Sequence, residues 1–277
     1  MVRIGVVTCQ VLELEFAHLL SHDKDTAEIW VIRNEYSEVL TGALEKYNSK
    51  KIHIIARADE FNTRSDPDNN PNSDRGTAIL VEVKQLGLHS HIPTLQSETR
   101  HSVRAMSPFV ETVFLGYGLC GNAFREMDDV FRDIPIPVTM TMDQDGPVDD
   151  CVGLIIGGRE NYYAEQCKCA GTMFMNAGFS KYTGDMLARD IPEKLRPKKD
   201  KIMRQLMVGY KRALLLPTPV MGEKELYENS KEFNLTYGLK VESRPGTLDL
   251  LKKGWEAAKR SAIKDPVRNA MVSAHGK

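Results

Sequence analysis

The 277-residue sequence has no excess of charge of either sign. Its 37 lysines and arginines are balanced by 38 aspartates and glutamates, which gives a formal net charge of −1. This balance excludes both the basic field of a general nucleic-acid binder and a polyanionic tail. The sequence also lacks a signal peptide and any run of the roughly 18 apolar residues that a membrane span needs. We therefore expect a soluble, cytoplasmic protein that binds neither nucleic acid nor membrane.

Cysteine is scarce and odd in number, with five residues in the chain. Free thiols or metal ligands are the expected state of such cysteines when no export signal is present. Cys9, Cys120 and Cys151 lie at the ends of predicted strands or in the turns beside them. Cys167 and Cys169 are two positions apart, and on a helix such positions point in different directions. We therefore expect only the first three cysteines to share a site.

Internal repeats and low-complexity tracts are absent, and strand and helix patterns alternate instead. Strands are predicted over residues 3–8, 29–32, 51–56, 112–115, 138–142, 152–156 and 213–216. Helices are predicted over residues 11–20, 37–47, 77–86, 123–131, 161–169, 201–212 and 247–274. This alternation is typical of a parallel sheet with helices on both faces. The predicted fold class is α/β: a three-layer sandwich with a mostly parallel, Rossmann-like sheet.

The length fits one α/β domain over residues 1–277, or two closely packed α/β halves. Residues 59–76 are rich in Asn, Asp, Ser and Pro and have few apolar side chains, so we predict a mobile surface loop there. Residues 254–277 are predicted to form a basic helical tail. The oligomeric state is left open, and a homo-oligomer is compatible with the sequence.

A glycine-rich turn is the most informative part of the chain. Gly116, Gly118 and Gly121 follow a predicted strand, precede a predicted helix, and have the spacing of a dinucleotide-binding fingerprint. Asn122 completes the turn, and Asp143 follows the next predicted strand as a candidate ribose ligand. Glycines let a backbone approach a ligand closely, and a helix N-terminus offers free N–H groups. Nucleotide binding is one interpretation, and a tight strand-to-helix turn is the other.

Thiols at strand ends suggest a second kind of site. Cys9, Cys120 and Cys151 would meet at one rim because the carboxyl ends of parallel strands share an edge. Zinc accepts thiolate and imidazole ligands, and His89 or His91 could supply the nitrogen. A reactive thiol centre is an alternative, since a helix N-terminus lowers a thiol pKa. Buried cysteines that pack as small apolar residues are the third interpretation.

Two other segments would place polar groups near the same rim. Asp149 and Asp150 precede Cys151, so they either orient a ligand and carry a proton or form a solvated acidic turn. Thr172 follows a glycine and could present its hydroxyl and a backbone N–H to a ligand. An ordinary strand after a glycine turn is the alternative for Thr172.

Six short segments occur in a recognisable order along the chain: 8–13 (TCQVLE), 88–93 (LHSHIP), 116–122 (GYGLCGN), 149–158, 171–174 (GTMF) and 244–251 (RPGTLDLL). Together they resemble the uncharacterised family catalogued as domain of unknown function 1638, which is found mainly in methanogenic archaea and other anaerobes. The resemblance covers most of the chain, and the 117–122 piece is the most specific part of it.

The resemblance implies a metal or thiolate centre, because the family pattern has cysteines at positions 9, 120 and 151 and a histidine at position 89. On this basis zinc is the expected metal, with Cys9, His89, Cys120 and Cys151 as ligands and Asp150 as the group that exchanges a proton. Genes of the family are often found near corrinoid-dependent methyltransferases. The resemblance therefore implies a corrinoid protein or methyltransferase as partner, with the corrinoid on that partner.

The function expected from these features is that of a metal–thiolate protein of anaerobic one-carbon metabolism, acting in methyl transfer. If it is an enzyme, it resembles a metal-dependent methyltransferase. The alternative is an accessory protein that binds a corrinoid, tetrapyrrole or nucleotide without catalysis of its own. In that case the binding residues are expected to be Gly116, Gly118, Gly121, Asn122 and Thr172.

Overall fold

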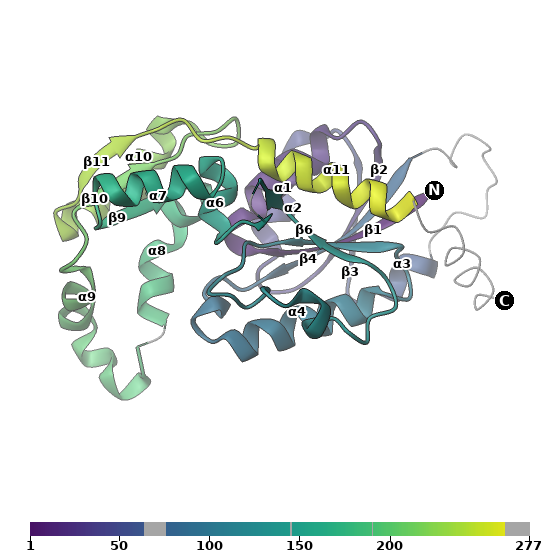
Figure 1. The fold of residues 1–277 in the computed structure, drawn as a ribbon, viewed down its shortest axis with the longest axis horizontal. Coiled ribbons are helices and arrows are strands. Elements are labelled where there is room, and N and C mark those ends of the chain that lie inside the picture. The colour runs from purple at the N-terminus through teal and green to yellow at the C-terminus, as the bar shows by residue number, and fades with distance from the viewer. Residues whose placement is uncertain (64–75, 145, 190, 264–277) are drawn as a thin grey trace.

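The computed structural model describes residues 1–63, 76–144, 146–189 and 191–263. Its larger part is a six-stranded sheet with the strand order β3-β2-β4-β1-β5-β6, in which every neighbouring pair is parallel (Figure 1). The strands are β1 (Val2–Cys9), β2 (Thr26–Ile32), β3 (Lys51–Ile55), β4 (Thr77–Lys84), β5 (Thr112–Gly116) and β6 (Val138–Met140). The predicted α/β fold with a parallel, Rossmann-like sheet is confirmed. In this order β4 separates β2 from β1.

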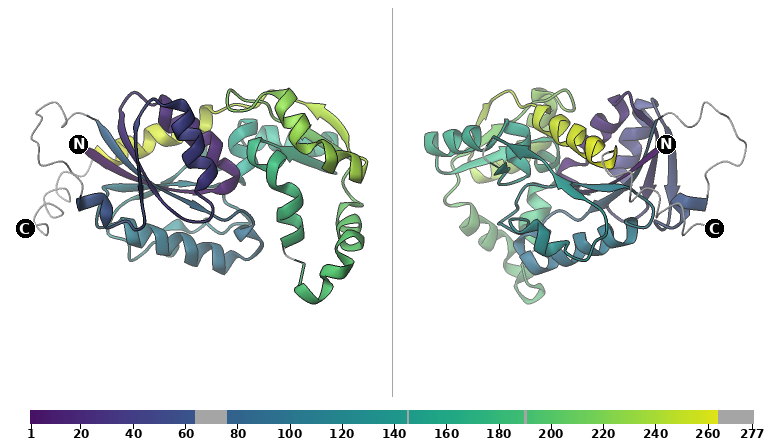
Figure 2. Two further views of the ribbon diagram at one scale, coloured as in Figure 1. Left: turned by 180° about the vertical axis from the view of Figure 1, so that it is seen from behind. Right: turned by 45° about the vertical axis from the view of Figure 1, so that its right-hand side comes forward.

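Helices cover both faces of this sheet. On one face lie α1 (Glu13–His22), α2 (Glu38–Tyr47) and α11 (Asp249–Ile263), and on the other lies α4 (Ile92–Met106), as Figures 1 and 2 show. The rings of Phe16 on α1 and Trp255 on α11 both pack against Phe114 of β5, at centroid distances of 5.8 and 6.2 Å. Strand β5 is fully buried, as expected for a strand covered on both faces.

A second, three-stranded parallel sheet lies at the end of the molecule toward which β1 runs (Figure 1). Its order is β11-β10-β9, with β9 (Thr172–Met175), β10 (Arg212–Leu215) and β11 (Lys240–Ser243). The helices of this part are α6 (Cys151–Ile156), α7 (Arg159–Lys168), α8 (Ala177–Arg189), α9 (Lys199–Met207) and α10 (Glu223–Tyr237). A separate hydrophobic cluster around Met175, Ala213 and Leu226 supports it. The chain then returns to the first sheet through α11.

The connecting segments contain short elements. These are α3 (Glu60–Thr63), α5 (Met127–Val130), the antiparallel pair β7 (Met142–Asp143) and β8 (Gly146–Pro147), and the 3-10 helices η1 (Gln10–Leu12), η2 (Leu88–Ser90) and η3 (Glu193–Lys198). Elements η1 and η2 follow β1 and β4, so they lie at the carboxyl edge of the large sheet.

Three predicted elements were wrong. Residues 77–86 were predicted as a helix and contain β4, whose β-branched residues fit a buried strand. Residues 152–156 were predicted as a strand and form α6, because a short apolar run does not distinguish a buried strand from a buried helix. The helix predicted over 123–131 is reduced to α5, and residues 120–126 form turns.

The predicted tail and loop fall partly on residues that the structure describes. Residues 254–263 are the last ten of the fifteen residues of α11 and pack on the large sheet, with Trp255 buried and Lys259 Nζ 2.8 Å from Asp23 Oδ1. This part is therefore a core helix rather than a tail. Residues 264–277 lie outside the described residues, as do residues 64–75 of the predicted loop over 59–76.

Candidate functional site

A pocket of about 220 Å³ opens at the carboxyl ends of the neighbouring strands β4, β1 and β5. Open parallel sheets bind ligands at this edge. The pocket is lined by Cys9, Val11, Gln85, Leu86, Leu88, His89, Tyr117, Cys120, Gly121, Asp150, Cys151 and Phe179. The structure thus brings together all four predicted metal ligands and the predicted proton-exchanging aspartate.

The three thiols are in direct contact. The Sγ atoms of Cys120 and Cys151 are 3.8 Å apart, and the thiol of Cys9 also forms a hydrogen bond with Cys151. All three side chains are buried and none forms a disulfide. Cys9 ends β1 and Cys120 follows β5, as predicted, whereas Cys151 is the first residue of helix α6 rather than the start of a strand.

Cys151 is the thiol that loses its proton most readily. Its sulfur accepts hydrogen bonds from the thiols of Cys120 and Cys9 and from the backbone N–H of Gly118, and these hold the pKa of Cys151 well below its usual value. The pKa values of Cys9 and Cys120 are raised, because each donates to Cys151 and because burial disfavours a thiolate. The arrangement favours one thiolate stabilised by two neutral thiols.

Close backbone packing holds the loops of Cys120 and Cys151 together. The N–H of Cys120 donates to the carbonyl oxygen of Asp149 at 2.9 Å. A Cβ atom at Gly118 would lie 2.4 Å from the carbonyl carbon of Asp150, so only glycine fits there. Cys120 itself has a φ of 46°, in the left-handed region that is uncommon for residues other than glycine. Such conformations concentrate at functional sites.

The glycine-rich turn is packed against protein atoms. A Cβ atom at Gly116 would lie 2.4 Å from the ring of Phe16, and the backbone at Gly121 adopts a φ of 71°. No helix begins at Gly121, so the turn lacks the helix N-terminus that phosphate binding uses. Asp143 accepts a hydrogen bond of 3.0 Å from the backbone N–H of Arg159. Close packing therefore explains Gly116 and Gly118, and the left-handed backbone explains Gly121.

Of the two candidate histidines, His89 lines the pocket and His91 does not. His89 is on η2, and its charge contributes to lowering the pKa of Cys151. The Nδ1 atom of His91 lies 2.7 Å from the hydroxyl of Thr94 and accepts from the backbone N–H of that residue. His91 therefore caps α4.

Asp150 begins α6 and lies beside the thiols. Its carboxylate accepts a hydrogen bond of 2.8 Å from the N–H of Gly153, and the hydroxyl of Tyr162 donates to it. Burial raises the pKa of Asp150 to about 6, and the charge of Cys151 adds to this effect. A carboxyl with this pKa can take up or release a proton near neutral pH. Asp149, in contrast, forms an ion pair of 3.0 Å with Arg159.

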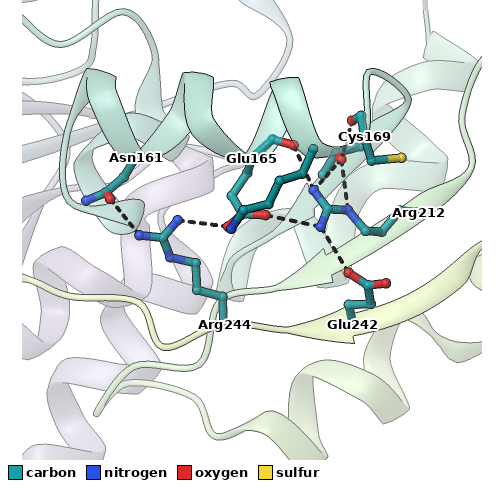
Figure 3. Close-up of polar contacts among 8 residues, drawn as sticks. Asn161, Glu165, Cys169, Arg212, Glu242 and Arg244 are labelled. Carbon is teal, nitrogen blue, oxygen red and sulfur yellow. Dashed lines mark hydrogen bonds and ion pairs between the residues drawn. The ribbon is translucent and has the colours of Figure 1, made fainter.

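Thr172 lies outside the pocket, on β9 of the second sheet. Its hydroxyl accepts a hydrogen bond of 2.8 Å from Arg212 and donates one of 2.7 Å to the carbonyl oxygen of Cys169. Arg212 also pairs with Glu165 at 3.1 Å and with Glu242 at 2.9 Å (Figure 3). This network attaches α7 to the second sheet, so the position of Thr172 is explained by structure.

Cys167 and Cys169 also lie outside the pocket. Cys167 is exposed on α7, and Cys169 follows the last residue of that helix. Neither residue lines the pocket of the other three cysteines.

The comparisons with known proteins identify the family. A family model described as "Protein of unknown function (DUF1638)" matches residues 83–255. The chain belongs to this family. The match confirms the resemblance in the sequence and includes His89, Cys120 and Cys151, whereas Cys9 precedes it. No curated protein and no solved structure matches the chain.

The pocket of this DUF1638 protein has the kinds of donor atoms that zinc prefers. Zinc–sulfur bonds of about 2.3 Å in a tetrahedron place two sulfurs about 3.8 Å apart, and the Sγ atoms of Cys120 and Cys151 have that separation. In the part of the chain that the structure describes, no group of three or more His, Cys, Asp or Glu side chains is arranged to hold a metal ion. A complete coordination sphere therefore requires a rearrangement of the Cys9 or His89 side chain.

Several residues that line the pocket of this DUF1638 protein were not predicted from the sequence. Tyr117 was part of the glycine-rich turn, and its place directly after a buried strand was the signal that it faces the ligand edge. Gln85 and Leu86 were assigned to a predicted helix. Phe179 comes from α8 beside the second sheet, and no local pattern predicts that contact.

Among the described helices, none is long and apolar enough to cross a membrane.

Proposed function

We propose that this DUF1638 protein is a metal–thiolate protein of anaerobic one-carbon metabolism, acting in methyl transfer with a corrinoid-dependent methyltransferase. The observation that carries the proposal is the convergence of Cys9, Cys120 and Cys151 on one pocket. Two of these sulfurs have the separation of ligands on one zinc ion. His89 and Asp150 lie on the walls of the same pocket. A reducing cytoplasm would keep these thiols free.

The proposal gives the side chains of the pocket two roles, metal binding and proton exchange. Cys9, Cys120, Cys151 and His89 would hold a zinc-like ion, which when bound would supply Lewis-acid activation of a thiol or another methyl acceptor. Metal binding requires thiols that have lost their protons. Cys151 meets this requirement first because its pKa is lowered. Asp150, with a pKa of about 6, takes up or returns a proton beside it.

The size of the pocket favours a small methyl acceptor. Its volume of about 220 Å³ is below the roughly 300–1,000 Å³ of pockets that enclose drug-sized ligands. A corrinoid macrocycle is larger still, so in this proposal it remains on the partner protein. An accessory role through the glycine-rich turn is less well supported, because Gly116 and Gly118 are packed against protein atoms.

Metal analysis of the full chain, purified without oxygen or chelator, tests the proposal. We expect a stoichiometric amount of zinc or a similar metal in the wild type and its loss in Cys120→Ser and Cys151→Ser, because a hydroxyl is a poor zinc ligand. Cys167→Ser and Cys169→Ser are the matched controls and should keep their metal. A wild-type protein that carries no metal, and retains none after zinc is added, contradicts the proposal.

A further inference from the structure

The hydroxyl of Tyr117 is a buried polar group beside the thiol pocket. Tyr117 follows β5, lines the thiol pocket and is 2% exposed. Its hydroxyl oxygen has no hydrogen-bond partner among the described residues. Buried tyrosine hydroxyls usually find one, because leaving a buried donor unpaired is unfavourable. A group of this kind, in a residue that lines a pocket, indicates a ligand that supplies the missing partner.

The hydroxyl of Tyr117 can donate a hydrogen bond. A phenol has an ordinary pKa of about 10 and therefore keeps its proton near neutral pH. Its ring packs against Phe124 at a centroid distance of 5.6 Å, which restricts the side chain to this position.

The remaining walls limit the ligand further. Val11, Leu86, Leu88 and Phe179 are apolar. The carboxylate of Asp150 is already occupied by hydrogen bonds from Gly153 and Tyr162. A volume of about 220 Å³ corresponds to about seven water molecules at about 30 Å³ each. The pocket thus suits a small molecule with a short apolar body.

We propose that the Tyr117 hydroxyl donates a hydrogen bond to a small ligand that binds beside the three thiols and carries an anionic or carbonyl acceptor atom. The inference deepens the proposed function and rests on it for the identity of the site. It assigns to Tyr117 the recognition of the ligand's acceptor atom, while the cysteines hold the metal.

Thermal unfolding of metal-free protein is the first test, because it needs no ligand. Tyr117→Phe removes the hydroxyl and keeps the ring. Since an unpaired buried hydroxyl destabilises the fold, the variant should unfold at a temperature about 2 °C or more above that of the wild type. The control is Tyr162→Phe, which loses a hydroxyl that donates to Asp150 and should unfold at a lower temperature. A Tyr117→Phe variant that unfolds at or below the wild-type temperature overturns the inference.

Binding of azide to the cobalt(II)-loaded full chain is the second test, with azide as the small anionic acceptor and visible absorption as the readout. We expect Tyr117→Phe to keep its cobalt and to bind azide about tenfold more weakly, the loss of one good hydrogen bond. Equal azide affinity in both proteins overturns the inference. A wild-type chain that binds no cobalt contradicts the proposed function instead, and the unfolding experiment then decides the role of Tyr117.

Discussion

The carboxylate of Glu13 on α1 accepts a hydrogen bond of 2.6 Å from the hydroxyl of Tyr182 on α8, 169 residues further along the chain. On the same helix, Glu15 is fully buried and accepts a hydrogen bond of 3.2 Å from the side chain of Asn176. The two carboxyl groups thus lie where the large sheet's helix layer meets the second sheet. Burial raises the pKa of each to about 7.

This burial predicts that stability decreases as the pH rises. The carboxyl of Glu15 has its ordinary pKa of 4.5 in the unfolded chain and a pKa of about 7 in the folded protein. Its contribution is fully present below 4.5 and is lost as the pH rises through 7, by an amount on the order of 3 kcal/mol. Glu15→Gln should therefore raise the free energy of unfolding at pH 8 and change it little at pH 4. Denaturant titrations at several pH values measure this, and a variant with the wild-type pH dependence would contradict it.

A second prediction concerns the proton of Cys151. Its hydrogen bonds with Cys120, Cys9 and Gly118 lower its pKa, so thiolate should form well below the usual range in metal-free protein. An ultraviolet titration of thiolate absorbance should show this early step in the wild type. Cys151→Ser should lack the step, and Cys167→Ser should retain it. A first step of unchanged size in Cys151→Ser would mean that another thiol is the one ionised.

A third prediction tests the packing between the two cysteine loops. Gly118→Ala places a Cβ atom 2.4 Å from the carbonyl carbon of Asp150. Overpacking of this kind typically costs about 1–3 kcal/mol, and it should also separate Cys120 from Cys151 and reduce metal binding. Gly42→Ala on α2 is the control, since its Cβ atom meets nothing within 4 Å and should stabilise the helix by about 0.5–1 kcal/mol. Denaturant unfolding and metal analysis of both variants test this prediction, and a Gly118→Ala variant with wild-type stability and metal content would contradict it.

A fourth prediction concerns the buried ion pair of Arg212 and Glu165, whose side chains are 8% and 5% exposed. Arg212→Met removes one of the cationic partners of the buried Glu165 carboxylate, which also pairs with Lys168 and Arg244, and should reduce the free energy of unfolding by about 1.5–3 kcal/mol. The double variant with Glu165→Gln should be less unstable than the sum of the two single changes. Lys240→Met removes an exposed partner of Glu242 and should cost at most about 1 kcal/mol. Equal decreases in the free energy of unfolding in Arg212→Met and Lys240→Met would contradict the prediction that the buried pair contributes more than the exposed one.

Local sequence was sufficient for elements whose pattern has one interpretation. The run before Cys9 and the run before Gly116 contain β-branched residues, which favour strands, and they form β1 and β5 as predicted. Because parallel strands end at a common edge, their positions also predicted that Cys9 and Cys120 would meet. The helix at residues 151–156 has cap residues at both ends: Asp150 caps its start, and Gly157, with a φ of 90°, ends it.

The sequence by itself determined the fold class, the family, and the placing of three thiols near one rim, because apolar periodicity and short motifs depend on neighbours along the chain. Tertiary structure decided which groups those thiols meet. His89 lines the pocket and His91 does not, and Phe179 of α8 contributes to the same lining. Among the described residues, none pairs with the buried hydroxyl of Tyr117. Tertiary structure also buried Glu13 and Glu15, which local pattern treats as exposed helix positions. The physical reason is that burial, hydrogen bonding and pKa depend on residues far apart in sequence, and only the folded chain brings these together.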